Sequence, residues 1–317
     1  MRILPRVQSV FCKIPDTELS YKFESTENVT WYLSSGMARK TEVLTYWYNF
    51  IMISKDQTSI VYFSHGGGPL PLLGDPGHQA MIAFMRQLPE QLPKPDAILV
   101  ISAHWEEPVP TLLGAANPPM FYDYYGFPES AYEINYPAPG HPALVNRIAK
   151  TLDNAGITSS INTKRGYDHG LFIPLSMMYP QANFPSLQLS LRQGLSPSFH
   201  ISLGKALQSC SDENLLVIGS GFSFHNMSSF FHHDPDMVNP RNNAFQDWLI
   251  ETITADIDQE ERESRLVAWE RAPQARYCHP REEHLLPLHV CAGLAGHKGK
   301  VIFDNRIMGV RSVAFKW

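Results

Sequence analysis

Residues 97–104 read AILVISAH, a run of apolar and small residues that ends in a histidine. A short apolar run of this kind, rich in β-branched residues, is typical of a buried strand. Two other strand-like runs end in a similar way: residues 59–64 come directly before His65, and residues 215–219 come shortly before His225. The pattern predicts strands that each deliver a histidine at or near the carboxyl end.

From residue 59 onward, short apolar runs alternate with amphipathic segments, which is the pattern of alternating strands and helices. We therefore expect one α/β domain with a central, mostly parallel or mixed sheet that is flanked by helices. The pattern predicts helices at residues 76–88, 142–155, 200–209, 243–253 and 282–294, and further strands at 187–191, 301–302 and 312–315. Residues 115–140 are irregular and rich in Pro, Tyr and Gly, which indicates a lid or a substrate wall.

Residues 1–55 lack a clear period and combine polar with aromatic residues. We predict that they form an N-terminal extension of unknown role, and that residues 56–317 form the main domain. Met52 lies just before the first strand-like run and is a candidate start of the natural chain, which would make residues 1–51 an appendage or a start-site artefact. A chain beginning at Met52 that failed to fold or lost activity would contradict this hypothesis.

The composition limits the partners of the protein. The 26 Lys and Arg residues against 31 Asp and Glu residues give a formal net charge of −5, and no basic run could follow a phosphate backbone, so we expect no nucleic-acid partner. No apolar stretch approaches the roughly 20 residues that cross a bilayer. The 4 cysteines are scattered without a C-x-x-C pair, which fits a reducing compartment. We expect a soluble, cytoplasmic protein, and the sequence indicates no oligomeric state.

The strand-end histidines predict a metal site. In open α/β sheets, ligands bind at the carboxyl ends of the strands, so His65, His104 and His225 are expected to converge there. Imidazole suits iron, zinc, copper or nickel, and three protein ligands leave coordination positions open. A carboxylate could instead replace the third imidazole in a two-histidine, one-carboxylate iron site, and the candidates are Asp75, Glu106 and Glu107.

Two further histidines lie in polar surroundings. His169 follows Asp168, which could set its tautomer, so His169 is a candidate acid or base. The alternative is a loop histidine, with Asp168 capping the next helix. His284 follows Glu283 near the start of a predicted helix, where the neighbouring charge should raise its basicity unless the helix start is solvated.

Seven motifs follow one another along the chain: SHGGGP (64–69), SAHW (102–105), YYGFP (124–128), YPAPG (136–140), DHG (168–170), HN (225–226) and EHLLPL (283–288). In this order they resemble the LigB-like class III extradiol ring-cleavage dioxygenases, and the 4,5-DOPA dioxygenase branch most of all. The resemblance covers the chain from about residue 59 to its end. It implies that residues 56–317 are an extradiol dioxygenase-like catalytic domain.

The resemblance also implies roles for single residues. It implies that His65, His104 and His225 bind the metal. It implies that His169 is the catalytic acid or base, and that His284 contacts the substrate or supports a ligand. Residues expected near the substrate or behind the ligands are Asp168, Tyr122 and Tyr125, and an aromatic wall could also include Tyr124 and Phe127.

The implied reaction is the opening of a small, DOPA-like catechol by O2 to a muconic semialdehyde-type product. Fe(II) is the metal expected for activity, because zinc cannot donate an electron to oxygen, although Zn(II) also suits three imidazoles. The founding members of the family use two histidines and a glutamate, so His225 stands where they have a carboxylate. The alternatives are a zinc-dependent hydrolase and a non-catalytic binding protein that resembles the Memo-type members of the superfamily.

Overall fold

The computed structural model describes residues 11–13, 19–25, 28–33, 58–210, 214–231 and 234–317. The chain divides into two compact units, Met1–Lys55 and Asp56–Trp317. In the first unit, an antiparallel sheet has the order β1-β2-β3, formed by β1 (Phe11–Lys13), β2 (Leu19–Ser25) and β3 (Asn28–Leu33). The sequence pattern did not predict these strands. The candidate start Met52 lies outside the described residues.

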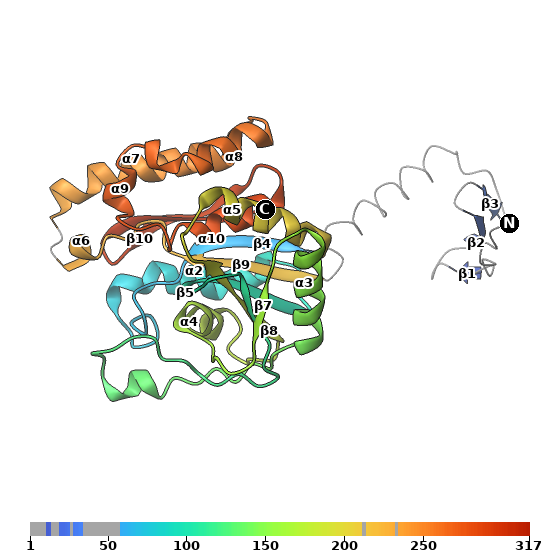
Figure 1. Ribbon diagram of the computed structural model, residues 1–317, viewed down its shortest axis with the longest axis horizontal. Coiled ribbons are helices and arrows are strands. Elements are labelled where there is room, and N and C mark those ends of the chain that lie inside the picture. Colours follow the sequence, from blue (N-terminus) through green and yellow to red (C-terminus); the bar gives the residue numbers. More distant parts are fainter. Residues whose placement is uncertain (1–10, 14–18, 26–27, 34–57, 211–213, 232–233) are drawn as a thin grey trace. The chain divides into compact units, whose positions relative to one another are not determined.

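The second unit is built around a mixed sheet, which in its described residues has eight strands in the order β10-β11-β4-β9-β5-β8-β6-β7 (Figure 1). The neighbours β4, β9, β5 and β8 run parallel, whereas β11 and β6 join them antiparallel. The predicted α/β fold with a mixed sheet is confirmed. The strands are β4 (Ser59–Ser64), β5 (Ala97–Glu107), β6 (Thr111–Leu113), β7 (Ser160–Asn162), β8 (Ser186–Arg192), β9 (Leu215–Gly221), β10 (Lys300–Ile307) and β11 (Val310–Lys316).

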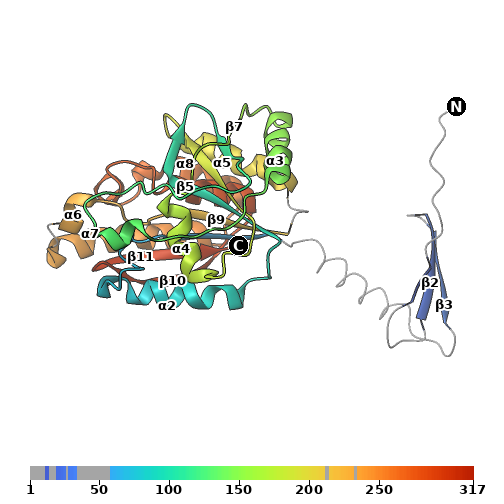
Figure 2. The ribbon, with the colours of Figure 1, turned by 90° about the horizontal axis from the view of Figure 1, so that it is seen from below.

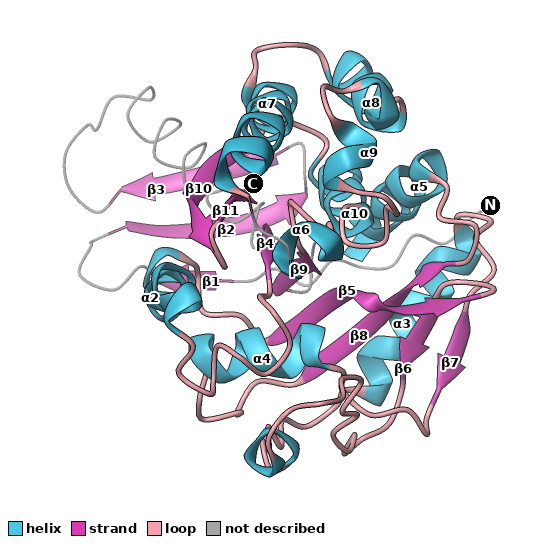
Figure 3. Ribbon diagram, turned by 90° about the vertical axis from the view of Figure 1, so that its left-hand side faces the viewer, coloured by secondary structure: helices cyan, strands magenta, loops and turns pink. Residues whose placement is uncertain are grey.

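Helices cover both faces of this sheet. α10 and α5 pack over one face of the central strands, and α4 packs over the other (Figure 1, Figure 3). α2 lies along β10 (Figure 2). No helix in the described segments is long and apolar enough to span a membrane. The helices are α2 (Gln79–Gln87), α3 (Pro142–Asn154), α4 (His169–Met178), α5 (Pro197–Leu207), α6 (Met227–Phe231), α7 (Pro235–Thr254), α8 (Gln259–Val267), α9 (Ala275–Cys278) and α10 (Leu286–Ala295).

Burial on both faces explains why the sequence predicts the central strands well. Every residue of β4 and β9 is buried, and so is β5 from Ala97 to Ala103. A strand with two buried faces needs apolar or small residues throughout, so it reads as a continuous run and not as an alternation. The strands β6 and β7 span only three residues each, which is too short to give a pattern, and the sequence analysis missed them.

Two predicted helices have starts that are wrong by four residues or more. α7 begins at Pro235 and not at residue 243. Asp234, the residue before Pro235, caps the helix by accepting a hydrogen bond from the Asp236 amide. α10 begins at Leu286 and not at residue 282. Pro287 lies in the first turn of α10, where its missing amide costs no helix hydrogen bond, so the proline is compatible with this start. His284 therefore lies in the turn before α10, and not in the first turn of the helix.

Candidate metal centre

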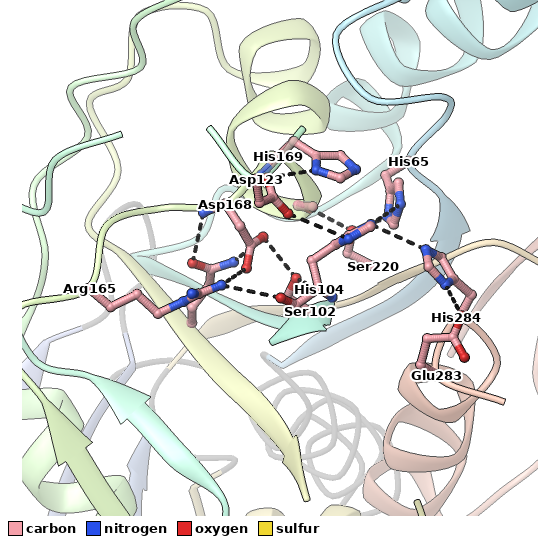
Figure 4. Close-up of polar contacts among 12 residues, drawn as sticks. His65, Ser102, His104, Asp123, Arg165, Asp168, His169, Ser220, Glu283 and His284 are labelled. Atoms are coloured by element: carbon pink, nitrogen blue, oxygen red, sulfur yellow. Dashed lines mark hydrogen bonds and ion pairs between the residues drawn. The ribbon is translucent and has the colours of Figure 1, made fainter. Parts of the chain in front are cut away.

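Five histidines from distant parts of the chain meet at the carboxyl ends of the parallel strands, and we call them the histidine cluster. His104 Nε2 lies 3.0 Å from His65 Nε2 and 3.2 Å from His284 Nε2 (Figure 4). The ring of His169 lies 3.8 Å from that of His104, centroid to centroid. The ring of His225 stacks on that of His284 at 3.4 Å. The predicted convergence of strand-end histidines is therefore present, with His169 and His284 added to it.

The ends of β4 and β9 set the position of His65. Ser64 pairs with Gly221 in the parallel ladder, and the His65 amide donates to the Gly221 carbonyl at 3.0 Å. Gly66 then turns the chain away with a φ of +91°, in the left-handed region that favours glycine. The histidine therefore sits at the point where the chain leaves the sheet, and its ring faces the cluster.

An irregularity in β5 sets the position of His104. The strand was expected to end at Ala103, yet it continues to Glu107, and its register against β8 shifts between Ser102 and Glu106. Ser102 pairs with Ser190 and Glu106 with the next residue, Leu191, so Ala103, His104 and Trp105 have no partner in β8. Bulges of this kind occur beside active sites, where they redirect a side chain. His104 is therefore carried inside a strand and not in the loop after it.

Four of the five imidazoles have an oxygen within 3.0 Å of their Nδ1 atom. Ser220 Oγ donates to the Gly170 carbonyl, so it accepts from His65 Nδ1 at 2.9 Å. His284 Nδ1 donates to Glu283 at 2.9 Å, and His225 Nδ1 lies 3.0 Å from the same oxygen. Such partners fix the tautomer and leave Nε2 with its lone pair, which is the arrangement found behind metal-binding histidines.

The cluster fits a divalent metal in its chemistry. Burial lowers the pKa of His65, His104 and His284 well below the usual histidine value, and the neighbouring histidines lower it further. These side chains are therefore neutral near pH 7, which is the form that binds metal. Two groups could hold an ion, since their ligand atoms lie within 4.8 Å of one another: His65, His104 and His169, and His225, Glu283 and His284.

The structure differs from the sequence analysis at His284 and at the carboxylates offered as ligands. His284 is only 4% exposed, and burial lowers its pKa although Glu283 is adjacent, so the expected rise in basicity is wrong. The three carboxylates considered as a third ligand bind elsewhere. Asp75 bonds His78, Glu106 pairs with Arg281, and Glu107 accepts from the Trp105 indole.

Two carboxylates that the sequence analysis did not offer as metal ligands, Asp123 and Glu283, touch the cluster instead. Asp123 accepts from His169 Nδ1 at 2.8 Å and lies 3.5 Å from His104 Nδ1. Burial opposes ionisation of Asp123, but the hydrogen bond from His169 and the nearby imidazoles outweigh it and lower its pKa to about 2. Glu283 is the other carboxylate. Asp123 lies inside the irregular aromatic stretch, and no spacing in the sequence connects it to a histidine.

The Asp168 side chain binds residues behind the histidine cluster and does not cap α4. Its carboxylate makes no capping hydrogen bond, and accepts instead from Ser102 Oγ, Gln188 Nε2 and Arg165 Nη2 at 2.8, 2.6 and 2.8 Å. Arg165 also donates to the His104 carbonyl at 3.3 Å. The network therefore ties β5 and β8 to the segment that begins α4.

Replacing Asp168 with asparagine should lower the free energy of unfolding by about 3–5 kcal/mol, because it leaves the largely buried Arg165 without its counter-charge. The measurement is urea unfolding at pH 7. Asp153→Asn, at an exposed helix position, is the matched control and should change stability by less than about 0.5 kcal/mol. Equal stability of the two variants would contradict a structural role for the Asp168 carboxylate.

A cavity of about 340 Å³ opens above the histidine cluster, and all five histidines line it. Of the four aromatic residues proposed as a substrate wall, Tyr124 and Phe127 line this cavity, whereas Tyr122 and Tyr125 do not. Tyr125 is 91% exposed, and the Tyr122 hydroxyl donates to the Ile134 carbonyl at 2.8 Å. Tyr122 and Tyr125 were expected near the substrate, but neither lines this cavity.

An α/β domain with a histidine cluster at the ends of its parallel strands, under a cavity, has the architecture of a metal-dependent enzyme. Residues 64–316 match the family described as the catalytic LigB subunit of aromatic ring-opening dioxygenase. The chain belongs to this family and is a ring-cleaving dioxygenase.

Named relatives agree with this assignment. The chain is 36% identical over 276 residues to "Dioxygenase tasH" of Hapsidospora irregularis, with 81% of this chain and 85% of that protein covered. It is 37% identical over 273 residues to the 4,5-DOPA dioxygenase extradiol of Beta vulgaris, with 83% and 99% covered. The crystal structure of an uncharacterized protein of Escherichia coli K12 matches with a TM-score of 0.66 at 26% identity, over 81% of this chain and 98% of that one.

Proposed function

We propose that this dioxygenase uses Fe(II) and O2 to open the ring of a small catechol beside its pair of hydroxyls, and that it releases a muconic semialdehyde-type product. The observation that carries the proposal is the convergence of five histidines on one cavity. Relatives from Beta vulgaris and Mirabilis jalapa are named 4,5-DOPA dioxygenase extradiol, which supports a catechol as the substrate.

In this proposal His65, His104 and His225 hold the metal. His65 and His104 present their Nε2 atoms to each other at 3.0 Å, and His225 keeps Nε2 free because its Nδ1 faces Glu283. Bound Fe(II) supplies a positive charge that lowers the pKa of the catechol hydroxyls, and the redox chemistry toward O2 that zinc lacks.

His169 is the proposed acid and base. Its Nδ1 and its backbone amide both donate to Asp123 Oδ1, at 2.8 and 3.0 Å, so the ring is fixed with Nε2 as the nitrogen that can exchange a proton. Nε2 accepts a proton from a catechol hydroxyl and returns one later in the reaction. Asp123 stays ionised at neutral pH and stabilises the imidazolium that forms.

Anaerobic reconstitution with Fe(II) tests the proposal. The protein is shown to hold iron, is mixed with a panel of catechols, and is then exposed to O2. We expect oxygen uptake together with a yellow semialdehyde. No uptake with any catechol, from protein that holds iron, would reject the proposal. Hydrolysis of other substrates by the zinc form would then indicate a zinc-dependent hydrolase, and the absence of any turnover would indicate a Memo-like binding protein.

A further inference from the structure

The cavity above the histidine cluster has a polar floor and apolar walls. The histidines form the floor. The described side chains that form the walls include Leu70, Phe127, Phe222, Met227, Phe230 and Met308. Tyr124 also lines the cavity, but its hydroxyl donates to the Ala131 carbonyl at 2.6 Å and has no proton left to donate to a substrate carboxylate. No Asp, Glu, Lys or Arg is among the described residues that line the cavity.

The two arginines beside the cluster are already paired. Arg281 binds both oxygens of Glu106, at 2.5 and 2.7 Å, and lies 3.5 Å from Glu283. Arg165 binds Asp168, and its guanidinium stacks over the ring of Trp105. Neither arginine lines the cavity. A carboxylate on a bound substrate would therefore find no cation among the described cavity residues.

The volume leaves room for more than a catechol ring. A protein cavity of about 150 Å³ holds benzene, and this cavity measures about 340 Å³. The ring hydroxyls are the groups that the histidine floor can bind, so a substituent on the ring must lie against the apolar walls. There, a charged group would lose its hydration without gaining a partner, whereas an apolar group gains about fourfold in binding for each methylene buried.

We propose that the preferred substrate is a catechol with an uncharged, apolar ring substituent, and not an amino acid such as DOPA. This inference rests on the function proposed above, since it assumes that the hydroxyls bind at the histidine floor. The apolar walls then discriminate between catechols with apolar and with charged substituents. In this proposal Phe127, Phe230 and Met308 contact the substituent.

A matched series of catechols tests the inference. 4-Methyl-, 4-ethyl- and 4-propylcatechol should show kcat/KM values that rise about fourfold per methylene. Dopamine, 3-(3,4-dihydroxyphenyl)propionate and DOPA carry charges on side chains of similar length, and each should fall about tenfold or more below 4-propylcatechol. A value for DOPA equal to or above that of 4-propylcatechol would overturn the inference while leaving ring cleavage itself established.

Binding gives a second readout that does not depend on turnover. Anaerobic calorimetry with the metal-loaded protein should give the same order of affinities, with a heat-capacity change on binding that becomes more negative as the alkyl chain lengthens. If no catechol is oxidised, the proposed function fails, and the binding order still decides whether the walls select apolar groups. Equal affinities for DOPA and 4-propylcatechol would then reject the inference.

A variant places a cation at the edge of the cavity. Met227 lines the cavity and is 50% exposed, so Met227→Arg can pair with a substrate carboxylate without full burial. This variant should shift the preference toward the propionate by up to about fivefold, as expected for a partly exposed ion pair. Met227→Leu is the matched control and should keep the preference for the alkyl catechols. An unchanged preference in Met227→Arg would place the substituent away from this wall and contradict the proposed orientation.

Discussion

Replacing His65 with alanine is expected to give a folded protein that binds no divalent metal and opens no catechol ring. His65 contributes the Nε2 atom that lies 3.0 Å from His104 Nε2, and alanine offers no ligand atom in its place. Loss of an outer hydrogen bond behind a metal ligand costs about 10- to 100-fold in metal affinity, and loss of a ligand should cost more.

The measurement is bound iron per chain after reconstitution and desalting, followed by oxygen uptake. His104→Ala and His225→Ala should behave as His65→Ala does. His297→Ala is the control, because this exposed histidine bonds only its neighbour's carbonyl among the contacts described, and it should keep iron and activity. Full iron occupancy in His65→Ala would contradict its assignment as a ligand.

Replacing His169 with alanine is expected to preserve iron binding and to lower kcat by about 100- to 10,000-fold, the usual contribution of a general acid or base. The reason is the position of the residue, because His169 lines the cavity and Asp123 holds it through Nδ1 and the backbone amide. Asp123→Asn should lower kcat less, because the imidazole remains and only its support is weakened.

The His169 variant also separates two ligand sets that the geometry allows. His65, His104 and His169 offer ligand atoms that lie within 4.8 Å of one another. This trio therefore competes with the proposed ligand set of His65, His104 and His225. Iron content and anaerobic catechol binding decide between them. If His169→Ala loses iron and His225→Ala retains it, His169 is a ligand and the proposed acid–base role is wrong.

The sequence predicts the fold and the main histidines for a physical reason. β4 and β9 are buried on both faces, so their sequences are continuous apolar runs, and a histidine beyond such a run is easily noticed. His169 and His284 were noticed from their acidic neighbours, and the family resemblance then implied a role for each. The histidines of the cluster and the resemblance to the family are therefore both evident in the sequence alone.

The rest of the site depends on contacts that no local pattern records. Asp123 and His169 are 46 residues apart in the sequence. The bulge that carries His104 arises from the pairing of β5 with β8, and not from the residues of β5 alone. The direction of the His284 pKa shift was predicted wrongly because an adjacent carboxylate is visible in a sequence, whereas burial at 4% exposure is not.

The order of strands has a consequence for when the histidine cluster can form. β9 lies between β4 and β5 in the sheet, yet it follows both of them in the chain, and Ser220 on β9 holds a histidine 155 residues earlier. Pairings over such distances form late, because the intervening chain must first be closed into a loop. During synthesis, β4 and β5 emerge before β9, the strand that lies between them. His65 can therefore bond the Ser220 hydroxyl only after β9 has joined the sheet. The histidine cluster is therefore complete only after the sheet closes, and we expect that a truncated chain that ends before β9 cannot assemble it.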